Sequence, residues 1–130
     1  MSRQSGVMQE LTTEQFATAL SKLGRLPPDA PQGVLDIGSN SVRLVGFSGS
    51  ARTPLPIYNE RAFVKLGESV SARGRIEGDY YTLALDTFRR FRKIADQLGI
   101  DKLAAFATAA VREAENRDAF LADAEQVLGH

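Results

Sequence analysis

The stretch GVLDIGSNSVRLV, residues 33–45, constrains the fold of this chain more than any other segment. Two apolar runs that contain β-branched residues, 34–37 and 42–47, flank a four-residue polar turn. This layout predicts a β-hairpin. Asp36 lies inside the first run, where a carboxylate is costly unless something compensates for it. The segment therefore raises the question of what Asp36 and the turn beside it hold.

The polar turn has two interpretations. Backbone N–H groups in a Gly-Ser-Asn-Ser turn can converge on an anion, and the serine hydroxyls add further donors. Asp36, at the end of its strand, can hold a hydrated Mg²⁺ ion, which prefers a carboxylate, water and substrate phosphate. The alternative is an ordinary hairpin turn in which Asp36 accepts hydrogen bonds from neighbouring backbone. On the turn alone the alternative is favoured, because such turns are common.

The rest of the chain alternates helical and strand-like patterns. The clearest helix covers residues 79–98, where apolar residues recur at spacings of three and four and Gly99 stands at the C-cap position. The other predicted elements are a third strand over 57–66, a loop over 67–78, a short buried strand over 103–107, and a final helix over 117–128 with Asn116 as its cap. The resulting order, β-β-β-α-β-α, predicts an α/β layer fold.

Residues 1–32 form a predicted N-terminal extension. Thr12 begins a short amphipathic helix in which Phe16, Leu20 and Leu23 follow at helical spacing. Prolines at 27, 28 and 31 then form a stiff linker. We therefore expect the extension to be separable from a main domain over residues 33–130.

Composition excludes several classes of site. The chain has 130 residues with 16 Lys and Arg against 16 Asp and Glu, so it offers no whole-molecule field for nucleic acid or an anionic membrane. It contains no cysteine and its single histidine is His130, which excludes thiol nucleophiles and Ser-His-Asp triads. No apolar run has the length of a membrane span, and the N-terminus lacks the layout of a signal peptide. We expect a cytoplasmic protein with no nucleic-acid or membrane partner.

A second candidate site follows the predicted strand over 103–107. The sequence ATAAVREAE places Thr108 and small residues before a single arginine, Arg112. Ligands collect at strand ends in α/β sheets, and an arginine there can bind phosphate oxygens bidentately. The alternative is that Arg112 pairs with Glu113 or Glu115 on the surface, which is the commoner outcome for a lone arginine.

Together the two motifs resemble the exopolyphosphatase/guanosine pentaphosphate phosphohydrolase family. DIGSNSVRL at 36–44 is followed by ATAAVREAENRDAF at 107–120 in the order and spacing of that family, and KLGESVSARGRI at 65–76 resembles its loop before a long helix. The resemblance covers about residues 33–128. It implies an incomplete actin-like ATPase lobe with a ribonuclease H-like α/β fold, a mixed sheet of order β-β-β-α-β-α, and an added N-terminal helical extension.

The resemblance also assigns roles to residues. The turn is the family's first phosphate loop, the aspartate matching Asp36 lies beside its catalytic metal, and the arginine matching Arg112 contacts substrate phosphate. Asp36 is therefore the predicted Mg²⁺ site. The predicted phosphate-binding residues are Gly38, Ser39, Asn40, Ser41, Thr108 and Arg112.

The activity implied by the resemblance is release of terminal phosphate from inorganic polyphosphate or guanosine pentaphosphate, with Mg²⁺ as cofactor and a homodimeric parent enzyme. In family members the helix matching 117–128 leads to an SGxEEAR-type segment with the water-activating glutamate, and then to a second phosphate loop. The sequence ends before both, so we expect the front part of a first lobe, without a catalytic residue and inactive alone. The alternatives are a non-catalytic phosphate- or nucleotide-binding module and a plain interaction domain.

Overall fold

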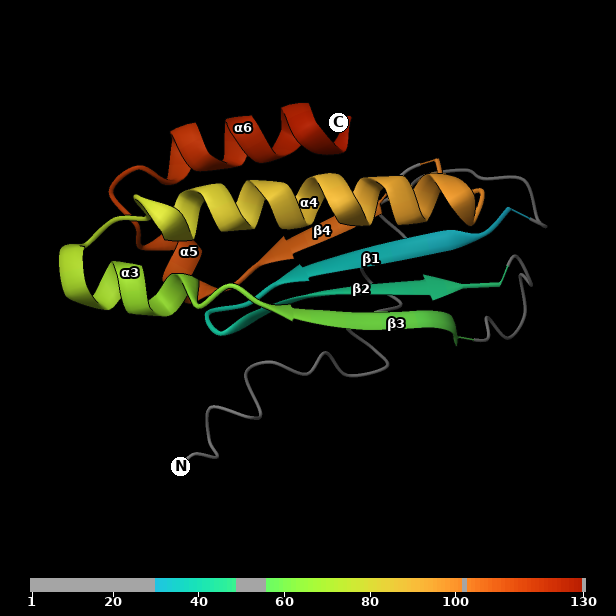
Figure 1. The fold of residues 1–130 in the computed structure, drawn as a ribbon, viewed down its shortest axis with the longest axis horizontal. Helices are drawn as coiled ribbons and strands as arrows, with labels where there is room; N and C mark the ends of the chain where they lie inside the picture. Colours follow the sequence, from blue (N-terminus) through green and yellow to red (C-terminus); the bar gives the residue numbers. More distant parts are fainter. Residues whose placement is uncertain (1–29, 49–55, 102, 130) are drawn as a thin grey trace.

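The computed structural model describes residues 30–48, 56–101 and 103–129. They form a four-stranded sheet in the order β3-β2-β1-β4, with the two longest helices on one face and the shorter helix α3 at one end (Figure 1). The strands are β1 (Gln32–Ile37), β2 (Ser41–Phe47), β3 (Pro56–Phe63) and β4 (Leu103–Ala107). The helices are α3 (Leu66–Arg73), α4 (Asp79–Gln97), α5 (Ala109–Arg112) and α6 (Arg117–Leu128).

Strands β1 and β2 form the predicted hairpin. They pair antiparallel, whereas β4 pairs parallel with β1, so the sheet is mixed as predicted. Successive side chains of a strand point to opposite faces. Leu35 and Ile37 join the hydrophobic core under the helices, so Asp36 between them belongs to the opposite face. Parallel pairing brings the carboxyl ends of β1 and β4 to the same end of the sheet.

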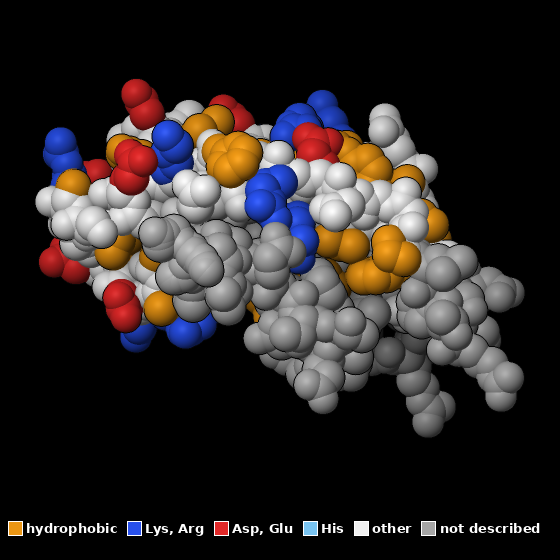
Figure 2. Space-filling model, turned by 90° about the horizontal axis from the view of Figure 1, so that it is seen from below, with side chains coloured by type: hydrophobic (Ala, Val, Ile, Leu, Met, Phe, Trp, Pro, Cys, Tyr) orange, Lys and Arg blue, Asp and Glu red, His pale blue; other side chains and the backbone are white. Residues whose placement is uncertain are grey.

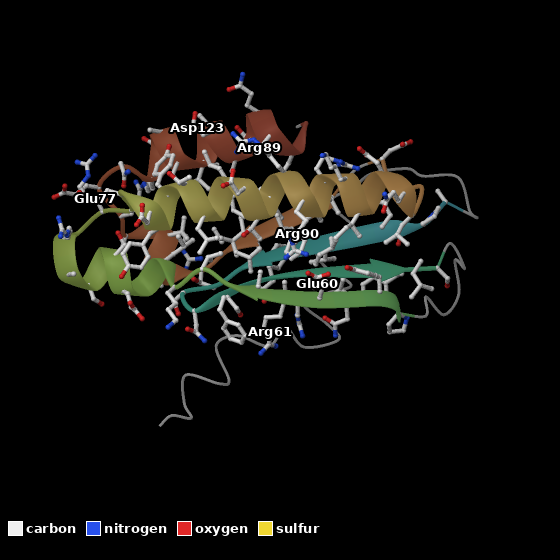
Figure 3. All side chains as sticks on the ribbon, in the orientation of Figure 1. Glu60, Arg61, Glu77, Arg89, Arg90 and Asp123 are labelled. Carbon is white, nitrogen blue, oxygen red and sulfur yellow. The ribbon has the colours of Figure 1, made fainter. Side chains whose placement is uncertain are left out.

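Helix α4 supplies the centre of the core and confirms the long helix predicted from apolar periodicity. Phe88 and Phe91 are fully buried, and the ring of Phe120 from α6 lies 6.0 Å from that of Phe88. At the margin of this layer, Glu60 of β3 and Arg90 of α4 point toward one another and form an ion pair (Figure 3). The layer is therefore held mainly by buried apolar area, the dominant favourable term in folding.

The predicted loop over 67–78 is wrong, because its first half is helix α3. The segment has few apolar residues, so it shows no amphipathic periodicity. Its ends stabilise it instead: Lys65 and Gly74 adopt left-handed conformations at the two caps, with φ of 53° and 74°. Glu68 in the first turn and Arg73 in the last turn complement the helix dipole.

Two further boundaries differ from the predictions. Strand β3 ends at Phe63 rather than at residue 66, since the left-handed backbone of Lys65 cannot continue a strand. A four-residue helix, α5, follows β4 where no helix was predicted. Most of the predicted extension, residues 1–29, lies outside the described residues, so its helix and linker stay predictions. At the end of that extension, Gln32 already belongs to β1.

The sheet face opposite α4 carries no helix among the described residues. Ile57 and Phe63 of β3 are exposed there, with 48% and 59% of their surface accessible. Viewed from below, the molecule shows hydrophobic side chains beside Lys and Arg side chains (Figure 2). Within the described ranges, no helix combines the length and the apolar character needed to cross a membrane.

Candidate functional site

The two predicted motifs meet at one end of the sheet. The turn after β1 and the segment after β4 lie side by side, because the backbone N–H of Thr108 donates to the carbonyl of Ile37 at 3.0 Å. Helices α3 and α5 begin at this same end and pack against each other. Residues that are about 70 positions apart in the sequence thus share one site, as the parallel pairing of β1 and β4 requires.

The turn itself is short and held by its carbonyl groups. The N–H of Gly38 donates to the carbonyl of Ser41 at 2.9 Å, which leaves Ser39 and Asn40 as the two central residues. The Asn40 carbonyl accepts from Val64 and Lys65 at 3.2 and 3.0 Å. By contrast, the backbone N–H groups of Ser39 and Asn40 donate to no acceptor among the described residues. The turn is therefore fixed through its acceptors, while the N–H groups of its two central residues stay available.

Gly67 is the closest point of contact between the turn and α3. Its N–H donates to the Ser39 carbonyl at 2.7 Å. A Cβ atom at this position would lie 3.0 Å from the Ser39 Cβ and 3.2 Å from the Ser39 carbonyl oxygen. Only glycine, which has no side chain, allows the helix to approach the turn this closely.

A cavity of about 640 Å³ opens between the turn, α3 and α5. We call it the turn cavity. Its wall contains two carboxylates, two serine hydroxyls and one amide side chain, and no lysine or arginine. It is lined by Ser39, Asn40, Gly67, Glu68, Val70, Ser71, Ala110 and Glu113. The cavity is thus rich in oxygen atoms and carries negative charge.

Glu68 and Glu113 were not predicted to share a site. Glu68 accepts a hydrogen bond from the Tyr80 hydroxyl at 3.0 Å, and this bond raises the pKa of Tyr80. Its other oxygen lies 3.9 Å from the Lys65 ammonium, in an exposed pair that adds little stability. No pattern in the sequence links the two glutamates, since the packing of α3 on α5 alone brings them together.

Asp36 does not line the turn cavity. It is 3% exposed and lies one residue before the end of β1, on the face opposite α4. Arg43 stands directly across from it on β2 and is 7% exposed, and Arg61 stands across from Arg43 on β3. Sequence reasoning left Arg43 out of the site, whereas the structure buries it beside Asp36.

The predicted Arg112 and Thr108 lie next to the turn cavity but do not line it. One N–H group of the exposed Arg112 guanidinium donates to the carbonyl of Ala107, the last residue of β4, at 2.6 Å. The other N–H groups of Arg112 have no acceptor among the described residues, and neither Glu113 nor Glu115 pairs with Arg112. The buried Thr108 hydroxyl likewise makes no hydrogen bond within the described ranges.

The donor set fits the needs of Mg²⁺ in one respect. This ion takes one or two carboxylates and keeps several waters and phosphate oxygens as its other ligands. Asp36, at the strand end beside the turn, and the cavity glutamates are such carboxylates. Across the described residues, no group of three or more His, Cys, Asp or Glu lies close enough to hold a metal by protein ligands alone. Any ion here would share its coordination with substrate and water.

Known proteins show the same sequence pattern and fold. The model of the Ppx/GppA phosphatase family matches residues 44–130. Exopolyphosphatase 1 of Mycobacterium tuberculosis is 36% identical over 98 residues, which cover 75% of this chain and 28% of that protein. The chain therefore spans less than a third of the length of this curated relative.

Solved structures agree with the sequence comparison. A Ppx/GppA family member from Aquifex aeolicus superposes with a TM-score of 0.72 at 27% identity, over 78% of this chain and 33% of the other. An exopolyphosphatase from Cytophaga hutchinsonii superposes with a TM-score of 0.69 at 29% identity, over 75% of this chain and 31% of the other. The actin-like α/β fold expected from the sequence is confirmed. By sequence and by fold, the chain belongs to the Ppx/GppA phosphatase family.

Proposed function

We propose that this chain supplies the first phosphate-binding site of a phosphoanhydride hydrolase. The substrate class is a linear chain of phosphates: inorganic polyphosphate, or the 5′-phosphates of guanosine pentaphosphate. The names of the relatives support the first of these, since they include exopolyphosphatases. The chain's own residues bind and orient terminal phosphate.

The observation that carries the proposal is the turn between β1 and β2. The carbonyl groups of residues 39–41 accept hydrogen bonds, while the N–H groups of Ser39 and Asn40, which line the turn cavity, have no acceptor in the described structure. Successive backbone N–H groups in such a turn form a concavity that binds anions. The buried hydroxyl of Thr108 is a further donor without a described partner at the same end of the sheet.

Arg112 extends this site toward the end of β4. Its guanidinium is held at one edge by the Ala107 carbonyl and keeps its other donors free of described partners. A planar guanidinium matches two phosphate oxygens at once, which a lysine cannot do. We assign Arg112 to a phosphate next to the one held by the turn.

The negative charge of the cavity bears on how phosphate enters it. Glu68 and Glu113 line the wall, so a bare polyanion would meet like charges there. Phosphate bound as its magnesium complex avoids this repulsion. The cavity glutamates face such an ion directly, whereas Asp36 lies outside the cavity near the end of β1 and would hold a hydrated ion beside the turn. When bound, magnesium neutralises phosphoryl oxygens.

Calorimetric titration with tripolyphosphate, with and without Mg²⁺, tests this function. We expect Mg²⁺-dependent binding by the wild-type chain, without hydrolysis. Asp36→Asn should reduce the gain in affinity that Mg²⁺ brings, and Arg112→Ala should weaken binding by about tenfold or more, the loss of one charge-assisted hydrogen bond. Arg89→Ala is the matched control, because Arg89 is exposed on α4 and pairs locally with Asp86 (Figure 3). Wild-type affinity in both site variants would contradict the proposal.

A further inference from the structure

The side chain of Asn116 joins the two loops that follow α3 and α5, the helices that line the turn cavity. Its Oδ1 accepts from the backbone N–H of Ile76 at 3.0 Å, and its Nδ2 donates to the carbonyl of Ile76 at 2.6 Å. We call this two-bond contact the Asn116 clasp. It connects the α3–α4 loop with the α5–α6 loop across 40 positions of the sequence.

Each end of the clasp is close to one wall of the cavity. Ile76 follows the end of α3, whose residues form one wall, and Asn116 follows Glu113 of the other wall by three positions. A backbone hydrogen bond from Glu115 to the Gly74 carbonyl, at 2.9 Å, runs beside the clasp. The clasp thus fixes the separation of α3 and α5 at the end of the cavity away from the turn.

The side chain of Asn116 does not cap α6, contrary to the prediction from sequence. It occupies the N-cap position of α6, and its backbone carbonyl accepts from Phe120 at 3.0 Å. Its side chain makes no capping hydrogen bond to α6. The amide hydrogen-bonds the backbone of Ile76 instead. Its removal would therefore break the contact between two loops and leave the start of α6 unchanged.

We propose that Asn116 is a positioning residue for phosphate binding in the turn cavity. An amide side chain offers its donor and its acceptor on separate atoms, so Asn116 can bond both the N–H and the carbonyl of one backbone residue. With the clasp in place, Ala110 and Glu113 keep a fixed position relative to Gly67 and the turn. The part of this inference that concerns phosphate rests on the proposed function, whereas the part that concerns the wall position does not.

Ser69 offers a matched control within the same region. It is 1% exposed, donates to the Arg75 carbonyl at 2.6 Å and accepts from the Glu77 N–H at 3.2 Å. It therefore makes two partly buried hydrogen bonds, as Asn116 does, but both stay on the α3 side, to the residues before and after Ile76, and leave the Asn116–Ile76 contact intact. Ser69→Ala should lower overall stability by a similar amount without freeing α5.

Amide hydrogen exchange on the full chain tests the wall position without any ligand. In Asn116→Ala, the amides of Arg112, Glu113 and Ala114, which bond within α5 and its C-cap, should exchange about fivefold or more faster than in Ser69→Ala at equal global stability. Asn116→Asp retains the acceptor for the Ile76 N–H but sets a carboxylate oxygen against the Ile76 carbonyl, so it should not restore the wild-type rates. Equal exchange in Asn116→Ala and Ser69→Ala would overturn the inference.

Titration with tripolyphosphate and Mg²⁺ then tests the consequence for binding. Asn116→Ala should weaken affinity about fivefold or more, and Ser69→Ala less than about twofold. Unchanged affinity in Asn116→Ala, with α5 loosened, would overturn the positioning role. Absence of binding by the wild-type chain would contradict the proposed function instead. The exchange comparison would still show whether the Asn116 clasp holds α5 in place.

Discussion

The layer formed by α4 on the sheet and the end formed by the turn, α3 and α5 share one apolar core, but hydrogen bonds to the turn add directional contacts at the end. In the first region, Phe88 and Phe91 are fully buried in an apolar cluster. In the second, Leu66 of α3 and Val111 of α5 belong to the same apolar cluster, and backbone hydrogen bonds from residues 64, 65 and 67 to the turn carbonyls fix the turn in place. Apolar burial is non-directional and supplies stability, whereas hydrogen bonds fix positions. Stability and site geometry should therefore respond to different substitutions.

The largest expected effect lies in the α4 layer. Phe91→Ala should lower the free energy of unfolding by about 3–5 kcal/mol, because it removes a fully buried ring and leaves a cavity. Leu83→Ala on the same helix is the control, since Leu83 is 47% exposed and should change stability by less than about 0.5 kcal/mol. Urea unfolding measures both. A similar small loss of stability in the two variants would contradict the claim that buried side chains of the α4 layer supply most of the stability.

The second effect should appear in binding more than in stability. In Gly67→Ala the new Cβ would lie 3.0 Å from the Ser39 Cβ, so the turn must shift. We expect the affinity for tripolyphosphate with Mg²⁺ to fall about tenfold, or about 1.4 kcal/mol, with a smaller change in unfolding free energy because alanine favours the helix.

Gly46→Ala provides the contrast for this experiment. It is the same substitution at the far end of β2, where the nearest atoms lie at 3.4 Å and beyond. Its affinity should match that of wild type. If Gly46→Ala weakened binding as much as Gly67→Ala, contact with the turn would not be the cause.

The smallest effect is a pH dependence in the α4 layer. Burial, and then a hydrogen bond to Asp123 of α6, raise the pKa of Tyr81 from 10.0 to about 12. The neutral phenol is thus favoured in the folded state, and its contribution is fully present below pH 10. Stability should fall as the pH rises from 10 through about 12, because the unfolded chain releases the proton first.

Unfolding curves at alkaline pH measure this dependence. Tyr81→Phe should lose the part of it that belongs to Tyr81, and Asp123→Asn should keep most of that part because burial is its larger cause. If the stability of Tyr81→Phe fell with pH as much as that of wild type, the dependence would belong to other groups.

Sequence reasoning succeeded where the signal is local and apolar. The hairpin, the long helix and the strand over 103–107 follow from periodicity, and their bounds match β4 and nearly match α4. It failed at α3, because tertiary contacts at Gly67 and backbone caps at Lys65 and Gly74 hold that helix. These contacts leave no periodic pattern in the sequence.

The candidate site was predictable only in part for the same reason. Ser39 and Asn40 stand out as a polar turn after a strand, and they line the cavity. Glu68 and Glu113 join them through the packing of α3 on α5, which neither motif encodes alone. The direction of the Arg112 side chain, back to Ala107, depends on the turn of α5 that follows β4.

The central claim, that the turn cavity binds phosphate, is tested most directly by following backbone amide resonances of the ¹⁵N-labelled chain during titration with tripolyphosphate and Mg²⁺. We predict the largest shifts at Ser39 and Asn40, whose N–H groups have no described acceptor, with smaller ones at Gly67 and Ala110 on the cavity walls. Amides of α4 should change little. Saturable shifts confined to other parts of the chain, with Ser39 and Asn40 unmoved, would contradict the claim.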